Sequence, residues 1–245
     1  MLSAMYSPLL YVTALAALLF STPMNAHHQA APLTSRQQAI ATISAYTATG
    51  NQARLHDALA QGLAAGLTVN EEKEVLVQLY AYCGFPRSLY GLTTLMKLLD
   101  ERKAQGIQDV LGKEASPITS TAPKYERGKQ NLAQLTGQPE PNPKTGANAF
   151  SPEIDRFLKE HLFADIFERD VLTFQEREIA TISALISQGG VEPMLQSHMG
   201  MGMHVGLSET QVRQIIALDE TAAGKPEAES ARAVLTKALA AKAKQ

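Results

Sequence analysis

A glutamate and a histidine in the second half of this 245-residue chain have the residue types and the spacing for proton transfer. Glu178 stands near the start of one expected helix, and His198 lies within the next. If the two helices face each other, Glu178 can orient one imidazole nitrogen and leave the other free to exchange protons. Such a pair suits decarboxylation or isomerisation. Each residue also has a structural alternative: Glu178 can favour the positive end of its helix dipole, and His198 can be a packing residue.

The first half of the chain contains polar side chains that could bind a substrate. Tyr82 and Arg87 are candidates to bind an anionic substrate, although Arg87 could instead form a surface ion pair. Cys83 is the only cysteine, so it is either a small buried filler or a reactive thiol whose pKa Arg87 lowers. A single cysteine excludes an internal disulfide framework, a cysteine-rich zinc site and a dithiol redox pair within one chain.

Methionine and histidine are concentrated between Met194 and His204 (MLQSHMGMGMH), a composition that would also suit Cu(I). Packing of a methionine stripe into a core explains the same pattern more simply. We therefore expect no metal site and no cofactor.

The overall charge excludes a dedicated nucleic-acid binder. The chain has 22 Lys and Arg against 24 Asp and Glu, so it lacks the excess of basic residues that binds a phosphate backbone.

Residues 1–35 carry no Lys, Arg, Asp or Glu and contain the apolar run Leu9–Phe20. As a helix this run would rise only about 18 Å, too short for a bilayer core of about 30 Å. It indicates a signal peptide over residues 1–26 and a periplasmic or secreted protein, without membrane attachment after cleavage.

The chain contains an internal repeat. The segment Ile40–Ala45 (IATISA) recurs as Ile179–Ala184, and Gly66-Leu67 recurs as Gly206-Leu207. A six-residue identity with flanking matches in register indicates duplication.

Each copy carries the helix start and stop signals of a helical hairpin. Capping-box patterns, which begin helices, occur four times: Thr34-x-x-Gln37, Thr68-x-x-Glu71, Thr173-x-x-Glu176 and Ser208-x-x-Gln211. Gly66 and Gly206 stand where a helix ends in a left-handed residue. The sequence thus predicts an all-α protein, with repeats over residues 33–105 and 151–220, a linker over 106–150 and a C-terminal helix over 227–245. That last helix has few large apolar residues, so we expect it to pack lightly or to contact a partner.

Two stretches resemble the carboxymuconolactone decarboxylase family, whose superfamily includes alkylhydroperoxidase D. The first is 33–96, with Gly66-Leu67-Thr68 and the run from Tyr82 to Pro86 (YCGFP); the second combines 150–163 with 172–216. The resemblance implies two helical repeats packed as a pseudo-dimer, and a homo-oligomer of trimer or hexamer type. It also places Tyr90 where many relatives have a polar residue after the Gly-x-Pro turn, as a third substrate-binding candidate.

The resemblance also assigns the second repeat its site residues. The peroxidase branch uses a Glu, a C-x-x-C pair and a His four positions after the second Cys. Glu178 (or Glu176) and His198 match the Glu and the His, whereas Val191 and Met194 stand at the two cysteine positions. A dithiol peroxidase mechanism therefore has no nucleophile here.

In the first repeat, Ala39 and Ala58 replace the acid and the imidazole, so that copy is expected to be catalytically inactive.

Three function classes remain open. The favoured one is an exported carboxymuconolactone decarboxylase-like enzyme that performs acid/base chemistry on a small organic acid. The alternatives are a peroxiredoxin-like or alkylhydroperoxidase-like antioxidant protein and a non-catalytic helical oligomer that serves as a binding module.

Overall fold

The computed structural model describes Met1 and residues 31–243, so the expected signal peptide lies, apart from Met1, outside the described residues. All regular secondary structure in the described part is helical, which confirms the predicted all-α class. The elements are α1 (Ser35–Thr49), α2 (Gln52–Ala64), α3 (Val69–Ala104), α4 (Lys124–Thr136), α5 (Gly146–Phe150), α6 (Pro152–Phe157), the π-helical segment η1 (Leu158–Ile166), α7 (Phe174–Gln188), α8 (Glu192–His204), α9 (Glu209–Ala223) and α10 (Lys225–Lys242). No helix of the described residues is both long and apolar enough to span a membrane.

All four expected capping boxes form, and they fix the starts of α1, α3, α7 and α9. In each, the hydroxyl of the cap residue accepts a hydrogen bond from the N3 backbone, and the N3 side chain accepts one from the cap backbone. Each cap of this kind stabilises its helix by about 1 kcal/mol.

Residues 35–104 and 174–242, called the first half and the second half below, contain the same series of helices. α1 and α7 have 15 residues each, and α2 and α8 have 13 each. Within α3, Gly84 breaks the helical geometry with φ 78° and ψ 161°, and Gly224 between α9 and α10 adopts nearly the same conformation, φ 104° and ψ 165°. A residue with a Cβ is strained at such a positive φ. Pro86 and Pro226 each follow two residues later, so α10 is the counterpart of the second segment of α3.

The C-terminal helix does not pack lightly, so that part of the expectation was wrong. α10 packs against α8 and α9 and buries small and medium side chains: Ala228, Ala231, Val234, Leu235 and Ala238. Alanines let two helices approach closely, so a helix with few large residues can still bury one whole face.

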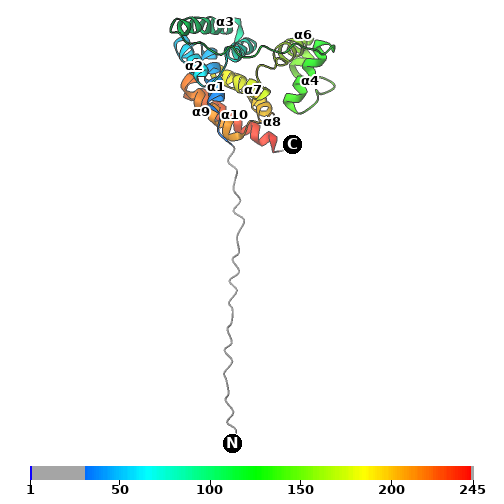
Figure 1. Ribbon diagram of the computed structural model, residues 1–245. Helices are drawn as coiled ribbons and strands as arrows, with labels where there is room; N and C mark the ends of the chain where they lie inside the picture. The colour runs from blue at the N-terminus through cyan, green and yellow to red at the C-terminus, as the bar shows by residue number, and fades with distance from the viewer. Residues whose placement is uncertain (2–30, 244–245) are drawn as a thin grey trace.

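The repeated segments form the centre of one shared core. α1 packs directly on α7 (Figure 1), and Ile40, Ile43, Ile179 and Ile182 are fully buried in the same cluster. The two halves therefore bury their apolar faces against each other, as expected of a pseudo-dimer.

Helix α4 and η1 form a smaller lobe to one side of the bundle (Figure 1). Its apolar side chains are Leu135, Leu162, Phe163, Ile166 and Phe167, joined by Met201 of α8. A Cβ at Gly128 would lie 1.8 Å from the carbonyl oxygen of Lys159, so this glycine permits the close approach of α4 to η1. The expected linker thus contains a helix that packs on the second half of the chain.

Candidate functional site

Glu178 and His198 form a hydrogen-bonded pair inside the bundle. Nδ1 of His198 lies 2.9 Å from Oε2 of Glu178, which joins α8 to α7. The Glu178 side chain is fully buried, and 11% of the His198 side chain is exposed. A carboxylate at this nitrogen favours the tautomer with the proton on Nδ1 and leaves Nε2 available for proton exchange.

Tyr82, contributed by α3, lies against the same imidazole. The two ring centroids are 5.4 Å apart and the rings meet edge to face, at 82°. The Tyr82 hydroxyl is buried near Thr181 and makes no hydrogen bond of normal geometry. Burial and the neighbouring Glu178 carboxylate raise the pKa of Tyr82 well above its usual value, so its phenol is neutral and serves as a donor.

Two buried polar atoms of this site lack a regular hydrogen bond among the described residues: Oε1 of Glu178 has no partner there, and the hydroxyl oxygen of Tyr82 lies near Thr181 without a bond of normal geometry. Each such atom costs about 1–3 kcal/mol relative to a satisfied one, and most buried polar atoms in proteins are satisfied. Beside a partly exposed imidazole, they give the site one free acceptor and one free donor. These groups are of the types that hydrogen-bond to a small polar molecule and exchange a proton with it.

A fully buried arginine positions the helix that carries Glu178. Arg177 donates from Nη2 to Oε1 of Glu74 at 2.7 Å and from Nη1 to Oε1 of Gln78 at 2.8 Å. Gln78 donates in turn to the backbone oxygen of Arg177 at 2.8 Å and to Thr181 Oγ1 at 3.0 Å. These bonds fix α3 against α7, and with them Tyr82 against Glu178. Glu74, Gln78 and Arg177 could not be singled out from the sequence, because these contacts join residues about a hundred positions apart.

The structure separates the two glutamates that could match the family acid. Oε2 of Glu176 accepts the backbone N–H of Thr173 at 2.9 Å, so this residue completes the capping box of α7. Glu178 alone of the two meets His198. In the first half, the matched positions hold the buried Ala39 and Ala58.

Cys83 lies next to Tyr82 and is partly buried. Burial raises the pKa of its thiol to about 11, against a smaller opposite effect of Arg87. The thiol is therefore protonated at neutral pH, which favours the filler alternative over the reactive one. At the two positions that would hold the family cysteines, Val191 caps α8 and Met194 is exposed.

The three expected substrate-binding residues do not lie together. Tyr82 contacts His198, whereas Arg87 and Tyr90 line a separate cavity that also includes Thr47 and Leu55. None of Glu178, His198 and Tyr82 lines that cavity.

Three of the four methionines around His198 are core residues, and Met194 is exposed. Met199, Met201 and Met203 are buried, and Met199 and Met203 belong to the main apolar cluster. In the described part of the chain, no three or more His, Cys, Asp or Glu side chains are grouped so as to hold a metal ion.

Part of the chain matches a known protein family. Residues 152–237 match the model of the Carboxymuconolactone decarboxylase family, a range that begins at α6, ends within α10 and includes both Glu178 and His198. No curated protein matches the chain. Residues 152–237 are therefore a carboxymuconolactone decarboxylase-like segment of the chain.

Proposed function

We propose that the protein is an exported carboxymuconolactone decarboxylase-like enzyme that performs acid/base chemistry on a small organic acid. The observation that carries the proposal is the 2.9 Å contact between Glu178 and His198, within the segment that matches the family. A histidine with one nitrogen held by a buried carboxylate and the other free is a common general acid or base.

Each residue of the site has a distinct part in this chemistry. In a decarboxylation, the carboxylate leaves as CO₂, and the electron pair left on carbon takes a proton from Nε2 of His198. In an isomerisation, Nε2 removes a proton from one carbon and returns it to another. Glu178 holds Nδ1 of the imidazole and so orients Nε2, and the neutral Tyr82 hydroxyl donates a hydrogen bond to a negatively charged oxygen of the substrate.

A cavity of about 470 Å³ beside α8 supports access by a small molecule. Its lining includes Ser197 and Met201, one position before and three positions after His198, together with His204 and Lys242, but not His198 itself. The volume lies in the range of small-molecule sites, and the ammonium group of Lys242 suits an acidic substrate.

Export is supported by the uncharged N-terminal segment with its apolar run Leu9–Phe20. Fractionation of cells that produce the full chain tests this part. A processed chain outside the cytoplasm is expected, and a full-length cytoplasmic chain would contradict export.

A screen of small unsaturated carboxylic and lactone acids tests the function itself, with CO₂ release and isomer formation as readouts. The control is the double variant Glu178→Gln/His198→Asn, which keeps side chains of similar shape but cannot relay a proton. Turnover by the wild type that is absent from the double variant supports the proposal. No turnover, or equal turnover by both proteins, would contradict it.

A further inference from the structure

Two cavities of the described bundle occupy equivalent places in the two halves of the chain. The first, of about 200 Å³, is lined by Thr47, Gly50, Leu55, Pro86, Arg87 and Tyr90 among others. The second, of about 130 Å³, is lined by Ile186, Gly189, Leu195, Pro226, Glu227 and Ser230 among others. Each residue of the second set stands 139 or 140 positions after its counterpart in the first. The internal repeat has therefore duplicated a cavity as well as a fold.

Both cavities lie where two helices begin. The first is bordered by Gln52, the first residue of α2, and by the start of the second segment of α3 after Gly84. The second is bordered by Glu192, the first residue of α8, and by the start of α10. The first turns of helices present unpaired N–H groups and a partial positive charge, so both cavities favour negative charge.

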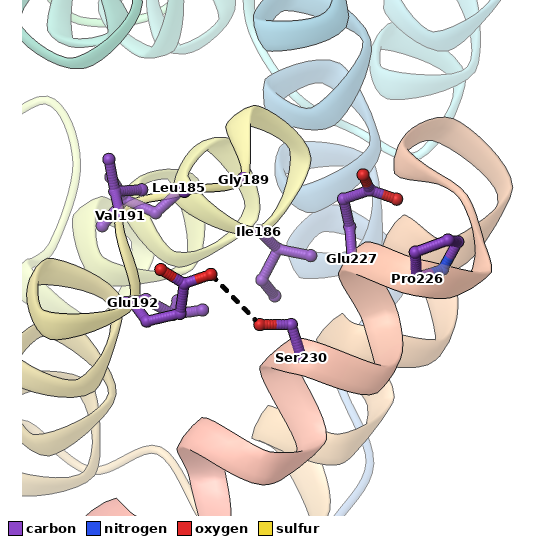
Figure 2. Close-up of a pocket in the computed structure, with 10 residues that line it drawn as sticks. Leu185, Ile186, Gly189, Val191, Glu192, Pro226, Glu227 and Ser230 are labelled. Atoms are coloured by element: carbon purple, nitrogen blue, oxygen red, sulfur yellow. Dashed lines mark hydrogen bonds between the residues drawn. The ribbon is translucent and has the colours of Figure 1, made fainter.

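The second cavity contains its own negative charges. Glu192 and Glu227 lie in the first turns of α8 and α10, and their carboxylates border the cavity from opposite sides (Figure 2). Oε1 of Glu192 accepts a hydrogen bond from Ser230 at 3.3 Å, drawn as the dashed line in Figure 2. Here side chains of the protein supply the anions that the two helix starts favour.

The first cavity is lined by residues at the equivalent positions, but the charge of its lining is opposite. Gln52 replaces Glu192, Arg87 replaces Glu227, and Tyr90 replaces Ser230. The first turn of α2 contains no acidic residue. The change from two carboxylates to one guanidinium leaves this cavity with positive charge that its own lining does not neutralise.

The position of Arg87 depends on the glycine beneath it. A Cβ at Gly50 would lie 1.3 Å from Nη1 of Arg87, so the guanidinium rests directly on the Gly50 backbone. Arg87 takes part in none of the ion pairs formed among the described residues. Its donors are therefore free for a bound anion, while Leu55 and Pro86 offer an apolar wall.

We propose that the cavity around Arg87 is a binding site for a small carboxylate anion with an apolar body. Arg87 binds the carboxylate through paired N–H groups, the Tyr90 hydroxyl and the Gln52 amide donate further hydrogen bonds, and Leu55 and Pro86 contact the apolar part. The site is distinct from the Glu178–His198 pair, because the two share no residue. The pseudo-equivalent cavity around Glu227 does not bind such an anion.

Titration of the folded protein with benzoate, followed by calorimetry, tests the proposal. Wild type should bind benzoate, and Arg87→Glu, which copies the charge of the second half, should weaken binding about tenfold or more. Lys97→Glu makes the same charge change on an exposed position of the same helix and should leave binding unchanged. No binding by the wild type at millimolar benzoate, or equal loss in both variants, would overturn the proposal.

Backbone amide spectra locate the bound anion and separate this proposal from the proposed function. Benzoate should shift the amide resonance of Gly50 but not that of its counterpart Gly189. The same shift should occur in His198→Asn, because the cavity does not involve the imidazole. A shift confined to residues around His198 would place benzoate in the other site and overturn the proposal.

Discussion

Glu178 and His198 are joined at 2.9 Å between two helices whose neighbouring side chains are mostly apolar. The positions that correspond to them in the first half are both alanine and are buried in the same core. One half of the pseudo-dimer therefore carries a polar pair where the other half is packed with methyl groups. Because a buried polar pair adds less to stability than good apolar packing, its presence in one half only is more easily explained by chemistry than by folding.

Arg177 should contribute strongly to stability through its buried contacts. Arg177→Met leaves Glu74 with only the partly exposed Arg169 as an ion-pair partner and removes the donor to Oε1 of Gln78, so we expect a loss of about 3 kcal/mol in the free energy of unfolding. Denaturant unfolding measures this loss. The control is Arg213→Met, which breaks an exposed pair with Glu209 and should cost less than about 1 kcal/mol. Similar losses in the two variants would contradict the account of the network.

Glu72 should make the protein less stable as the pH rises. Burial raises the pKa of this carboxyl to about 9, with a further contribution from Asp109 and an opposing one from Arg102. Between its unfolded value of about 4.3 and pH 9, the folded state retains a proton that the unfolded state releases, so stability falls by at most about 1.4 kcal/mol per pH unit. Above pH 9 this dependence ends.

Glu72→Gln removes the titrating group and tests that dependence. The variant should be more stable than wild type at pH 8, and the difference should shrink toward pH 5. The measurement is the free energy of unfolding at both values for both proteins. Parallel curves for wild type and variant across this range would show that Glu72 does not titrate as described.

Cys83 should be unreactive at neutral pH. Because burial raises the pKa of its thiol to about 11, alkylation by iodoacetamide should be slow at pH 7 and accelerate up to the highest pH the fold tolerates. Mass spectrometry of timed samples gives the rate. Cys83→Ser should leave acid/base turnover unchanged. A rate that levels off near pH 7, or hydroperoxide turnover lost in Cys83→Ser, would favour the antioxidant alternative.

The local features of the fold were predictable from the sequence, because they depend on residues close together in the chain. The capping box at Thr173 and the turn at Gly206 are set by three or four neighbours. The close packing of α10 was not predictable, since alanines give no strong apolar pattern. The place of Tyr82 beside His198 depends on how α3 packs on α7, which spacing along the chain does not reveal. For the same reason, the separation of Arg87 from Tyr82 was visible only in three dimensions.

The expected homo-oligomer should form through the second segment of α3. Phe85, Leu89 and Met96 are exposed there, whereas the counterpart positions of α10 hold Lys225, Glu229 and Thr236. Large apolar side chains on one of two equivalent faces favour contact with another copy. Leu89→Glu/Met96→Glu should lower the mass measured by light scattering, while Thr236→Glu, on the equivalent face of α10, should not. A monomeric wild type at micromolar concentration would contradict this expectation.

Proton transfer should occur at His198 in the second half and not at a histidine in the first. The most direct measurement is kcat/KM for an accepted substrate in His198→Asn and His56→Ala, with circular dichroism to verify that both fold. Asparagine can still donate to Glu178 but cannot transfer a proton, so His198→Asn should lower kcat/KM by about 10²- to 10⁴-fold. His56 pairs with Glu101 in the first half, and its loss should leave kcat/KM nearly unchanged. Equal kcat/KM in the two folded variants would contradict the account.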